Sequence, residues 1–120
     1  MAKTIILIVD TNQSNLELLA QQLAEEGYET LSAASLEELD KAIYGKRKIS
    51  LGLIDLSGFD QSIWERCDQL REAKIPFLVI SPRRSPSIQR DSMKHGASAV
   101  LTKPQGIKEL LGHIQTMLSD

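Results

Sequence analysis

The sequence predicts a doubly wound α/β domain, a five-stranded parallel sheet in the order 2-1-3-4-5 with helices on both faces. Apolar strand-like runs alternate five times with segments of helical periodicity along the 120 residues. Several runs are apolar throughout, as expected for strands that are buried on both faces. Short connections between the alternating elements favour parallel pairing. The length and the average composition predict one domain over residues 1–120.

The elements follow from the spacing of apolar residues. The expected strands are 4–9, 28–32, 49–54, 77–80 and 99–101. The expected helices lie around 16–24, 35–45, 63–74, 88–95 and 107–118. The second strand, Tyr28–Ser32, is the more polar one, and a polar strand suits the edge of a sheet.

Local signals mark several helix ends. Ser35 and Glu38 have the spacing of a capping box, which predicts a helix that begins at this point. Pro76 disfavours helical geometry in the residue before it, so the third helix is expected to end near residue 74. Ser85 and Pro86 predict the N-cap and the first turn of the fourth helix.

Composition excludes several classes of protein. The net charge of −2, with both signs interspersed, gives no general attraction to nucleic acid or to an anionic membrane. The apolar run Ile5–Val9 is too short to span a bilayer, so a cytoplasmic location is expected. A single cysteine, Cys67, excludes an internal disulfide and falls on the apolar face of the third helix, which predicts a core position.

Polar residues follow four of the expected strands. They are Asp10, Asp55, Ser81 and Lys103, after the first, third, fourth and fifth strands. Ligands of open parallel sheets bind outside the carboxyl ends of the strands, where the strand order reverses. Asp10 and Asp55 would lie on neighbouring strands about 4.8 Å apart and would repel each other. Either one of them is protonated or a cation neutralises the pair, and the candidates are Lys103 and a divalent metal.

Four segments carry a family resemblance, namely ILIVD at 6–10, LIDL at 53–56, VIS at 79–81 and GASAVLTKP at 96–104. They resemble the response-regulator receiver domains of two-component signalling, which have the flavodoxin-like fold. The resemblance implies that Asp55 accepts a phosphoryl group from a sensor histidine kinase or a phosphotransfer protein. Ser81 and Lys103 would bind the phosphoryl oxygens. The chain would not be an enzyme, beyond assisting its own phosphorylation and dephosphorylation.

The same resemblance implies a cofactor and a signalling surface. Mg²⁺ would be held by Asp10, Asp55 and the backbone carbonyl of Ser57. The bond between Lys103 and Pro104 would be cis, a conformation essentially restricted to proline. The signal would pass through the surface of the fourth helix, fifth strand and fifth helix, which in this family also serves homodimers.

Some positions depart from the family pattern. Thr11 stands where a second acid is usual, so the affinity for Mg²⁺ is expected to fall. Pro82 stiffens the loop after the switch hydroxyl, and Val100 replaces the usual aromatic residue. The segment 57–60 is about two residues shorter than the pattern. These departures favour a second hypothesis, a pseudo-receiver that binds proteins without being phosphorylated.

Other hypotheses and residues carry less weight. A flavin- or nucleotide-binding protein of similar winding would need a glycine-rich turn after the first strand, which DTNQSN at 10–15 lacks. Arg83 and Arg84 are interpreted as solvated loop residues that could also meet an acidic patch of a partner or a phosphate near the site. His95 and His113 have no second ligand at metal spacing, which favours structural roles.

Overall fold

A five-stranded parallel sheet forms the centre of the computed structural model, which describes residues 4–103 and 106–119. The strand order is β2-β1-β3-β4-β5, as predicted. The strands are β1 (Ile5–Val9), β2 (Glu29–Ala33), β3 (Leu51–Asp55), β4 (Phe77–Ser81) and β5 (Ala99–Thr102). The helices are α1 (Gln13–Glu25), α2 (Leu36–Ile43), α3 (Ile63–Glu72), α4 (Pro86–Lys94) and α5 (Ile107–Leu118).

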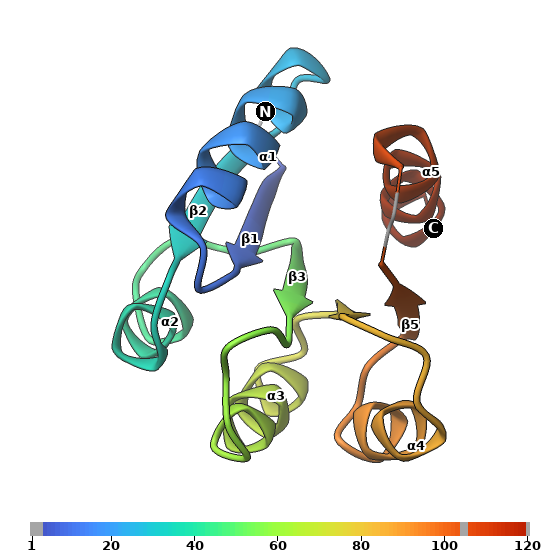
Figure 1. Ribbon diagram of the computed structural model, residues 1–120. Coiled ribbons are helices and arrows are strands. Elements are labelled where there is room, and N and C mark those ends of the chain that lie inside the picture. The colour runs from blue at the N-terminus through green and yellow to red at the C-terminus, as the bar shows by residue number, and fades with distance from the viewer. Residues whose placement is uncertain (1–3, 104–105, 120) are drawn as a thin grey trace.

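The helices form a layer on each face of the sheet. Helices α1 and α5 cover one face, and α2, α3 and α4 cover the other (Figure 1). Alternate residues of β1 show why its sequence is apolar throughout. Ile6 and Ile8 pack with α1 and α5, whereas Leu7 and Val9 belong to the core under α2 and α3. A strand with a core on both sides has no polar face.

Strand boundaries differ from the prediction by one or two residues. β1 begins at Ile5 instead of Thr4, and β3 begins at Leu51 although Ile49 was expected to start it. Ile49 is buried, and apolar content alone does not distinguish a buried residue before a strand from the strand itself. β3 continues through Asp55, so this carboxylate belongs to the last residue of the strand.

The predicted local signals are mostly found as expected. Ser35 accepts a hydrogen bond from the backbone N–H of Glu38, while the Glu38 carboxylate accepts one from Ala34 rather than from Ser35. Ser85 caps α4 and Pro86 is in its first turn. Cys67 is buried, and burial raises the pKa of its thiol to about 12. The cysteine is a core residue, as predicted.

Parallel pairing places four strand ends at one rim of the sheet. Val9 pairs with Ile54, Asp55 pairs with Ile80, and Ser81 pairs with Thr102. Asp10 follows β1 directly, and Lys103 follows β5 directly. The fold therefore brings the backbones of all four predicted site residues to the same rim.

Candidate functional site

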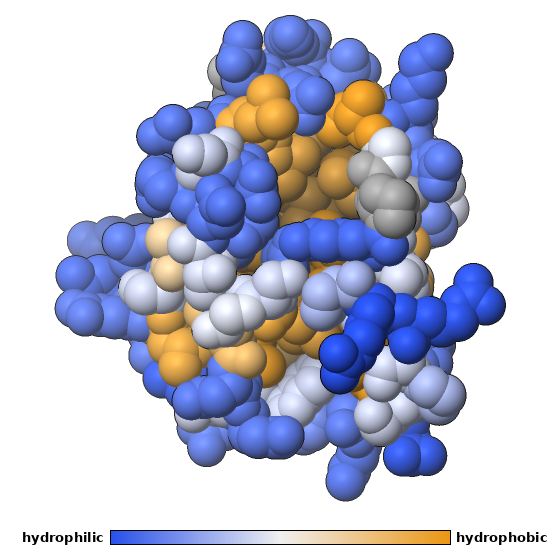
Figure 2. Space-filling view, viewed as in Figure 1, coloured by the Kyte–Doolittle hydropathy of each residue, from blue (hydrophilic) through white to orange (hydrophobic). Residues whose placement is uncertain are grey.

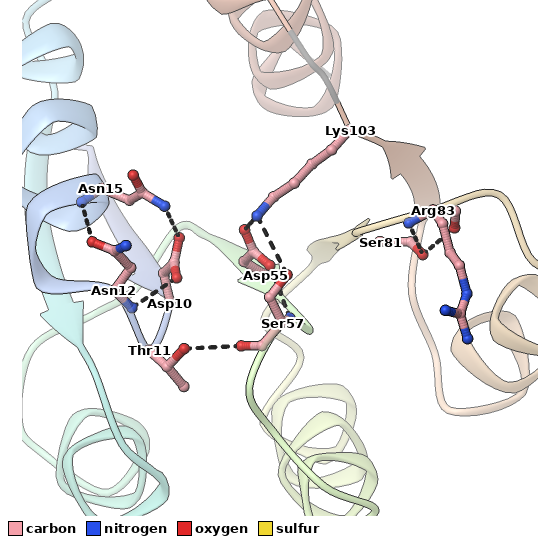
Figure 3. Close-up of polar contacts among 9 residues, drawn as sticks. All are labelled: Asp10, Thr11, Asn12, Asn15, Asp55, Ser57, Ser81, Arg83 and Lys103. Atoms are coloured by element: carbon pink, nitrogen blue, oxygen red, sulfur yellow. Dashed lines mark hydrogen bonds and ion pairs between the residues drawn. The ribbon is translucent and has the colours of Figure 1, made fainter.

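Two acids and a lysine converge at this rim. Lys103 reaches from the end of β5 past the end of β4, and its Nζ lies 2.6 Å from Oδ2 of Asp55 (Figure 3). The same ammonium donates to Oγ of Ser57 over 3.3 Å. Asp55 is buried, whereas a third of the lysine side chain is exposed. Lys103 was one of the two candidate cations for this pair of acids, and it pairs with Asp55.

Asp10 is held by the start of α1. Its Oδ1 accepts the backbone N–H of Asn12 over 2.9 Å, and its Oδ2 accepts the side-chain amide of Asn15 over 3.3 Å. Burial raises the pKa of Asp10, and the charge of Asp55 raises it further. The hydrogen bonds from Asn12 and Asn15 and the charge of Lys103 oppose this rise. Charged Asp10 is therefore held against a desolvation penalty.

Both oxygens of Asp55 have donors. Oδ1 accepts the backbone N–H of Ser57 over 2.9 Å, and Oδ2 faces Lys103. The first contact fixes the rotation of the carboxylate, because Ser57 belongs to the loop that follows β3 directly. The second contact neutralises charge in a place where water is largely excluded.

A hydrogen bond joins the loops that follow β1 and β3. The hydroxyl of Thr11 donates to the backbone carbonyl of Ser57 over 3.0 Å (Figure 3). Gly58, the next residue, has φ +83°, and a Cβ there would lie 2.4 Å from Oγ1 of Thr11. Only glycine allows both this backbone conformation and the close approach of the two loops.

The donor set suits Mg²⁺ in its chemistry. Mg²⁺ takes one or two carboxylates and several waters, and Asp10, Asp55 and the Ser57 carbonyl supply oxygen atoms at this rim. Each of these groups already accepts a hydrogen bond, from Asn15, Lys103 and Thr11 respectively. Among residues 4–103 and 106–119, no group of three or more acidic, histidine or cysteine side chains gathers around a metal position. A bound ion would therefore share these oxygen atoms with their present donors.

Ser81 shares the rim but its hydroxyl is directed elsewhere. It is buried, and its Oγ donates to the carbonyl of Arg83 over 2.5 Å within the loop between β4 and α4. In Figure 3 the hydroxyl lies on the opposite side of β4 from Asp55 and Lys103. The structure thus brings Asp10, Asp55 and Lys103 together and leaves the hydroxyl of Ser81 outside the cluster.

Several contacting residues lie outside the motifs that predicted the site. The backbone N–H of Asn12, the side-chain amide of Asn15 and the hydroxyls of Thr11 and Ser57 all bond to the cluster or its backbone. Asn12 also caps α1, and Asx residues before a helical pattern are the one sequence signal that points to this loop. The predicted cis bond between Lys103 and Pro104 lies outside the described residues.

A hollow with apolar walls opens beside the cluster. It has a volume of about 590 Å³ and runs between α1 and α5, with Leu16, Leu19 and Leu110 in its walls. Figure 2 shows its apolar lining between the two helices. Asp10, Asp55 and Lys103 line one end of this hollow, so the acidic cluster is reachable from the α1–α5 side of the sheet.

The histidines lie away from this site. Nδ1 of His95 is 2.7 Å from Oδ1 of Asp68, and its ring stacks on Trp64 with centroids 5.3 Å apart. These contacts join the end of α4 to α3. His113 is exposed on α5. In the described part of the chain no helix is long and apolar enough to cross a membrane.

The paired acids and the lysine lie at the carboxyl-end rim of a doubly wound sheet, which is where this class of α/β domain binds its ligands. The sequence model of the response regulator receiver domain matches residues 6–115. The chain belongs to this family, the receiver domains of two-component signal transduction. Receiver domains are phosphoacceptors rather than classical enzymes, and they generally bind Mg²⁺ at an acidic site.

Relatives of known name support the same assignment. The sensory transduction protein RegX3 of Mycobacterium tuberculosis is 32% identical over 96% of this chain and 51% of its own length. The transcriptional regulatory protein YvrH of Bacillus subtilis is 30% identical over 98% of this chain and 50% of its own length. The chain spans about half the length of these curated relatives.

Solved structures share the fold. A CheY-like receiver domain protein from Methanospirillum hungatei superposes with a TM-score of 0.88 at 28% identity, covering 98% of this chain and 95% of the other. A response regulator from Burkholderia pseudomallei, crystallised with a phosphorylated aspartic acid, a calcium ion and citrate, gives 0.80 at 27% identity. That match covers 98% of this chain and 69% of the other.

Proposed function

We propose that this chain, over residues 1–120, is a receiver domain in which Asp55 accepts a phosphoryl group. The donor would be a phosphohistidine on a sensor histidine kinase or on a phosphotransfer protein. The contact of 2.6 Å between Lys103 and Asp55 carries the proposal. An ammonium that already neutralises the acceptor carboxylate lies where the incoming phosphoryl oxygens need positive charge.

Phosphoryl transfer requires the protein mainly to position the reacting groups and to neutralise charge. A carboxylate oxygen of Asp55 attacks phosphorus in line with the leaving imidazole nitrogen, so an O–P bond forms as the N–P bond breaks. The backbone N–H of Ser57 keeps the carboxylate oriented through Oδ1. Lys103 then exchanges its carboxylate contact for the phosphoryl oxygens. The same groups would serve a small-molecule donor, which is how the domain would assist its own phosphorylation.

We expect this domain to bind Mg²⁺ weakly. Asp10, Asp55 and the Ser57 carbonyl would hold Mg²⁺, which supplies charge neutralisation for the transferring oxygens. The Thr11 hydroxyl, which now donates to that carbonyl, contributes no charge of its own. Affinity below that of a site with a second carboxylate is the expected result, because affinity depends on the number of charged ligands.

The signal would leave through α4, β5 and α5. Phosphorylated Asp55 would attract the hydroxyl of Ser81, which must first give up its bond to the Arg83 carbonyl. Breaking this bond changes the loop before α4. A homodimer through the same surface, the absence of direct nucleic-acid binding and the cytoplasmic location remain predictions.

Mass spectrometry tests the proposal directly. Incubation with phosphoramidate and Mg²⁺ should add about 80 Da to the protein, on a peptide that contains Asp55. Asp55→Asn should abolish the adduct, whereas Asp60→Asn, a substitution at an exposed acid of the next loop, should retain it. No adduct on Asp55 at saturating donor and tens of millimolar Mg²⁺ would overturn the proposal.

The second candidate is a pseudo-receiver that acts by binding proteins without phosphorylation. Two observations favour it: the hydroxyl of Thr11 occupies the Ser57 carbonyl, and the hydroxyl of Ser81 is turned away from Asp55. This candidate predicts no adduct at any Mg²⁺ concentration, together with unchanged partner binding by the Asp55→Asn variant. Pull-down of one partner by both forms of the protein would distinguish it from the phosphoacceptor.

A further inference from the structure

A second cavity lies on the other side of β4 from the acidic cluster. It has a volume of about 350 Å³ and is bounded by the loop between β4 and α4, by α4 and by β5. Arg83 and Arg84 line it from the loop, and Val100 and Thr102 line it from β5. This size falls within the range of pockets that hold small molecules, about 300 to 1,000 Å³.

The charge of this cavity has one sign. Arg83 and Arg84 are among its lining residues, and no acidic residue is. Within residues 4–103 and 106–119, neither Arg83 nor Arg84 takes part in the ion pairs found. Other lysines and arginines do pair with acids, namely Lys41, Arg47, Arg66, Arg71 and Lys103. Guanidinium groups remain charged at all physiological pH values and bind planar or tetrahedral oxyanions through two N–H groups.

Neutral donors complete the polar wall. Gln89, Thr102 and the buried Ser81, which carry neutral hydrogen-bond donors, also line the cavity. The Ser81 hydroxyl lies toward the loop of Arg83 in Figure 3. Val100 and Pro86 supply an apolar part of the lining. A bound molecule would therefore meet positive charge and hydrogen-bond donors at one part and an apolar wall at another.

We propose that this cavity is a binding site for a small phosphate monoester that carries an apolar group. The phosphate would pair with Arg83 and Arg84, and the apolar group would pack on Val100. The site is separate from the phosphoacceptor cluster, because Asp10, Asp55 and Lys103 line the hollow between α1 and α5 and none of them lines this cavity.

Occupancy would also regulate the receiver, a consequence that rests on the proposed function. The phosphate can accept the hydrogen bond that the hydroxyl of Ser81 now gives to the Arg83 carbonyl. A phosphorylated Asp55 needs the same hydroxyl on the opposite side of β4. The ligand and the phosphoryl group would compete for this hydroxyl, so each should disfavour the other.

Calorimetric titration with phenyl phosphate at low ionic strength, without Mg²⁺ or a phosphodonor, tests the binding site. The expected result is saturable binding with one site, weakened at least tenfold in the double variant Arg83→Gln/Arg84→Gln. Arg90→Gln removes one charge from the exposed face of α4 outside the cavity and should leave the affinity within about twofold. Val100→Phe, which fills the apolar part, should weaken phenyl phosphate more than inorganic phosphate.

Defined outcomes would overturn the proposal. The first is no binding of phenyl phosphate at about 10 mM. The second is an equal loss of affinity in the Arg90→Gln variant and in the double variant. The third is binding that persists in the double variant but disappears in Lys103→Met. The last result would place the phosphate at the acidic cluster. The double variant changes exposed side chains only, so it should fold. Circular dichroism checks that the Val100→Phe variant also folds.

The regulatory consequence has its own measurement. Phenyl phosphate should slow formation of the Asp55 adduct in the wild-type protein and leave the rate unchanged in the double variant. If the ligand binds and no adduct forms even in its absence, the proposed function fails while the binding site stands. If the adduct forms at the same rate with bound ligand, only the competition for Ser81 is wrong.

Discussion

The two sides of β4 differ in how their polar groups are used. On the side that faces β3, Lys103 neutralises Asp55, and two asparagines hold Asp10. On the side of the β4–α4 loop, two arginines have no acidic partner in the described residues, and the hydroxyl of Ser81 bonds to a carbonyl of its own loop. In the proposed function, the acceptor side is already assembled, whereas the relay side must rearrange before it can sense a phosphoryl group.

In the proposed function, this difference separates the groups that carry out phosphoryl transfer from the group that signals it. Groups that bind the phosphoryl oxygens speed the transfer when they are held in place, because correct positioning lowers the barrier to the reaction. A group that reports the modification has to have two arrangements of similar free energy. Two hydrogen bonds to the backbone of Arg83, each of about 1 kcal/mol, hold the hydroxyl of Ser81 in the first of them. The following substitutions test whether the two sides are independent.

Gly58→Ala should have the largest effect on the acceptor side. A side chain at φ +83° is strained, and its Cβ would collide with Thr11 and break the link between the loops. Together these effects should lower the free energy of unfolding by about 2 to 3 kcal/mol. Chemical denaturation measures the change.

Gly112→Ala is the matched control for this change. Gly112 lies within α5, and no atom lies within 4 Å of an added Cβ. The control should raise stability by up to about 1 kcal/mol, because alanine favours a helix over glycine. Equal effects of the two substitutions would show that the contact with Thr11 does not constrain the site.

Thr11→Asp should restore a charged metal ligand. The expected increase in Mg²⁺ affinity is roughly tenfold, about 1.4 kcal/mol, because a carboxylate replaces a neutral hydroxyl beside Asp10 and Asp55. Titration followed by Trp64 fluorescence or by calorimetry measures it. Thr116→Asp, which adds the same charge to an exposed position of α5, should leave the affinity nearly unchanged. An equal gain in Mg²⁺ affinity in both variants would show that the added net charge, and not a new metal ligand, causes the gain.

Ser81→Ala probes the relay side. Loss of the bond to the Arg83 carbonyl should lower the free energy of unfolding by about 1 kcal/mol, and it should leave Mg²⁺ binding unaltered because the hydroxyl faces away from the acids. Ser98→Ala, at an exposed loop position, should change stability by less than about 0.5 kcal/mol. A change in Mg²⁺ affinity in the Ser81 variant would contradict the separation of the two sides.

The smallest expected effect concerns Asp10 and pH. Burial raises its pKa above the ordinary 3.8, so the folded protein binds this proton more readily than the unfolded chain. Stability linked to this group is therefore fully present below pH 3.8 and is lost as the pH rises through the raised value. Asp10→Asn should be more stable than the wild type at neutral pH, and the difference should vanish in acid.

Asp60 provides a control of opposite sign. The N–H of Ser62 lowers the pKa of Asp60, so its stabilising contribution is present at neutral pH and declines as the pH falls through the lowered value. Asp60→Asn should therefore be slightly less stable than the wild type at neutral pH. Denaturation curves at several pH values check both variants, and a stability loss in Asp10→Asn at neutral pH would contradict the assigned cause of its pKa shift.

The sequence determined the fold class, the strand order and the four residues at the carboxyl ends of the strands, although Asp55 and Ser81 prove to be the last residues of β3 and β4. The periodicity of apolar residues indicates which faces of each element are buried. Parallel pairing then places the carboxyl ends of the strands at one rim of the sheet. Convergence of Asp10, Asp55 and Lys103 could be predicted for this reason. Strand boundaries could not be fixed to the residue, as Ile49 shows, because burial extends beyond the paired backbone.

Only the tertiary structure decided which way the polar side chains turn. The sequence placed Ser81 at the rim, but whether its hydroxyl faces Asp55 or the Arg83 carbonyl depends on the path of a loop. The bond from Thr11 to the Ser57 carbonyl joins residues 46 positions apart. Such contacts have no period in the sequence, because they depend on where two loops meet after the sheet has formed.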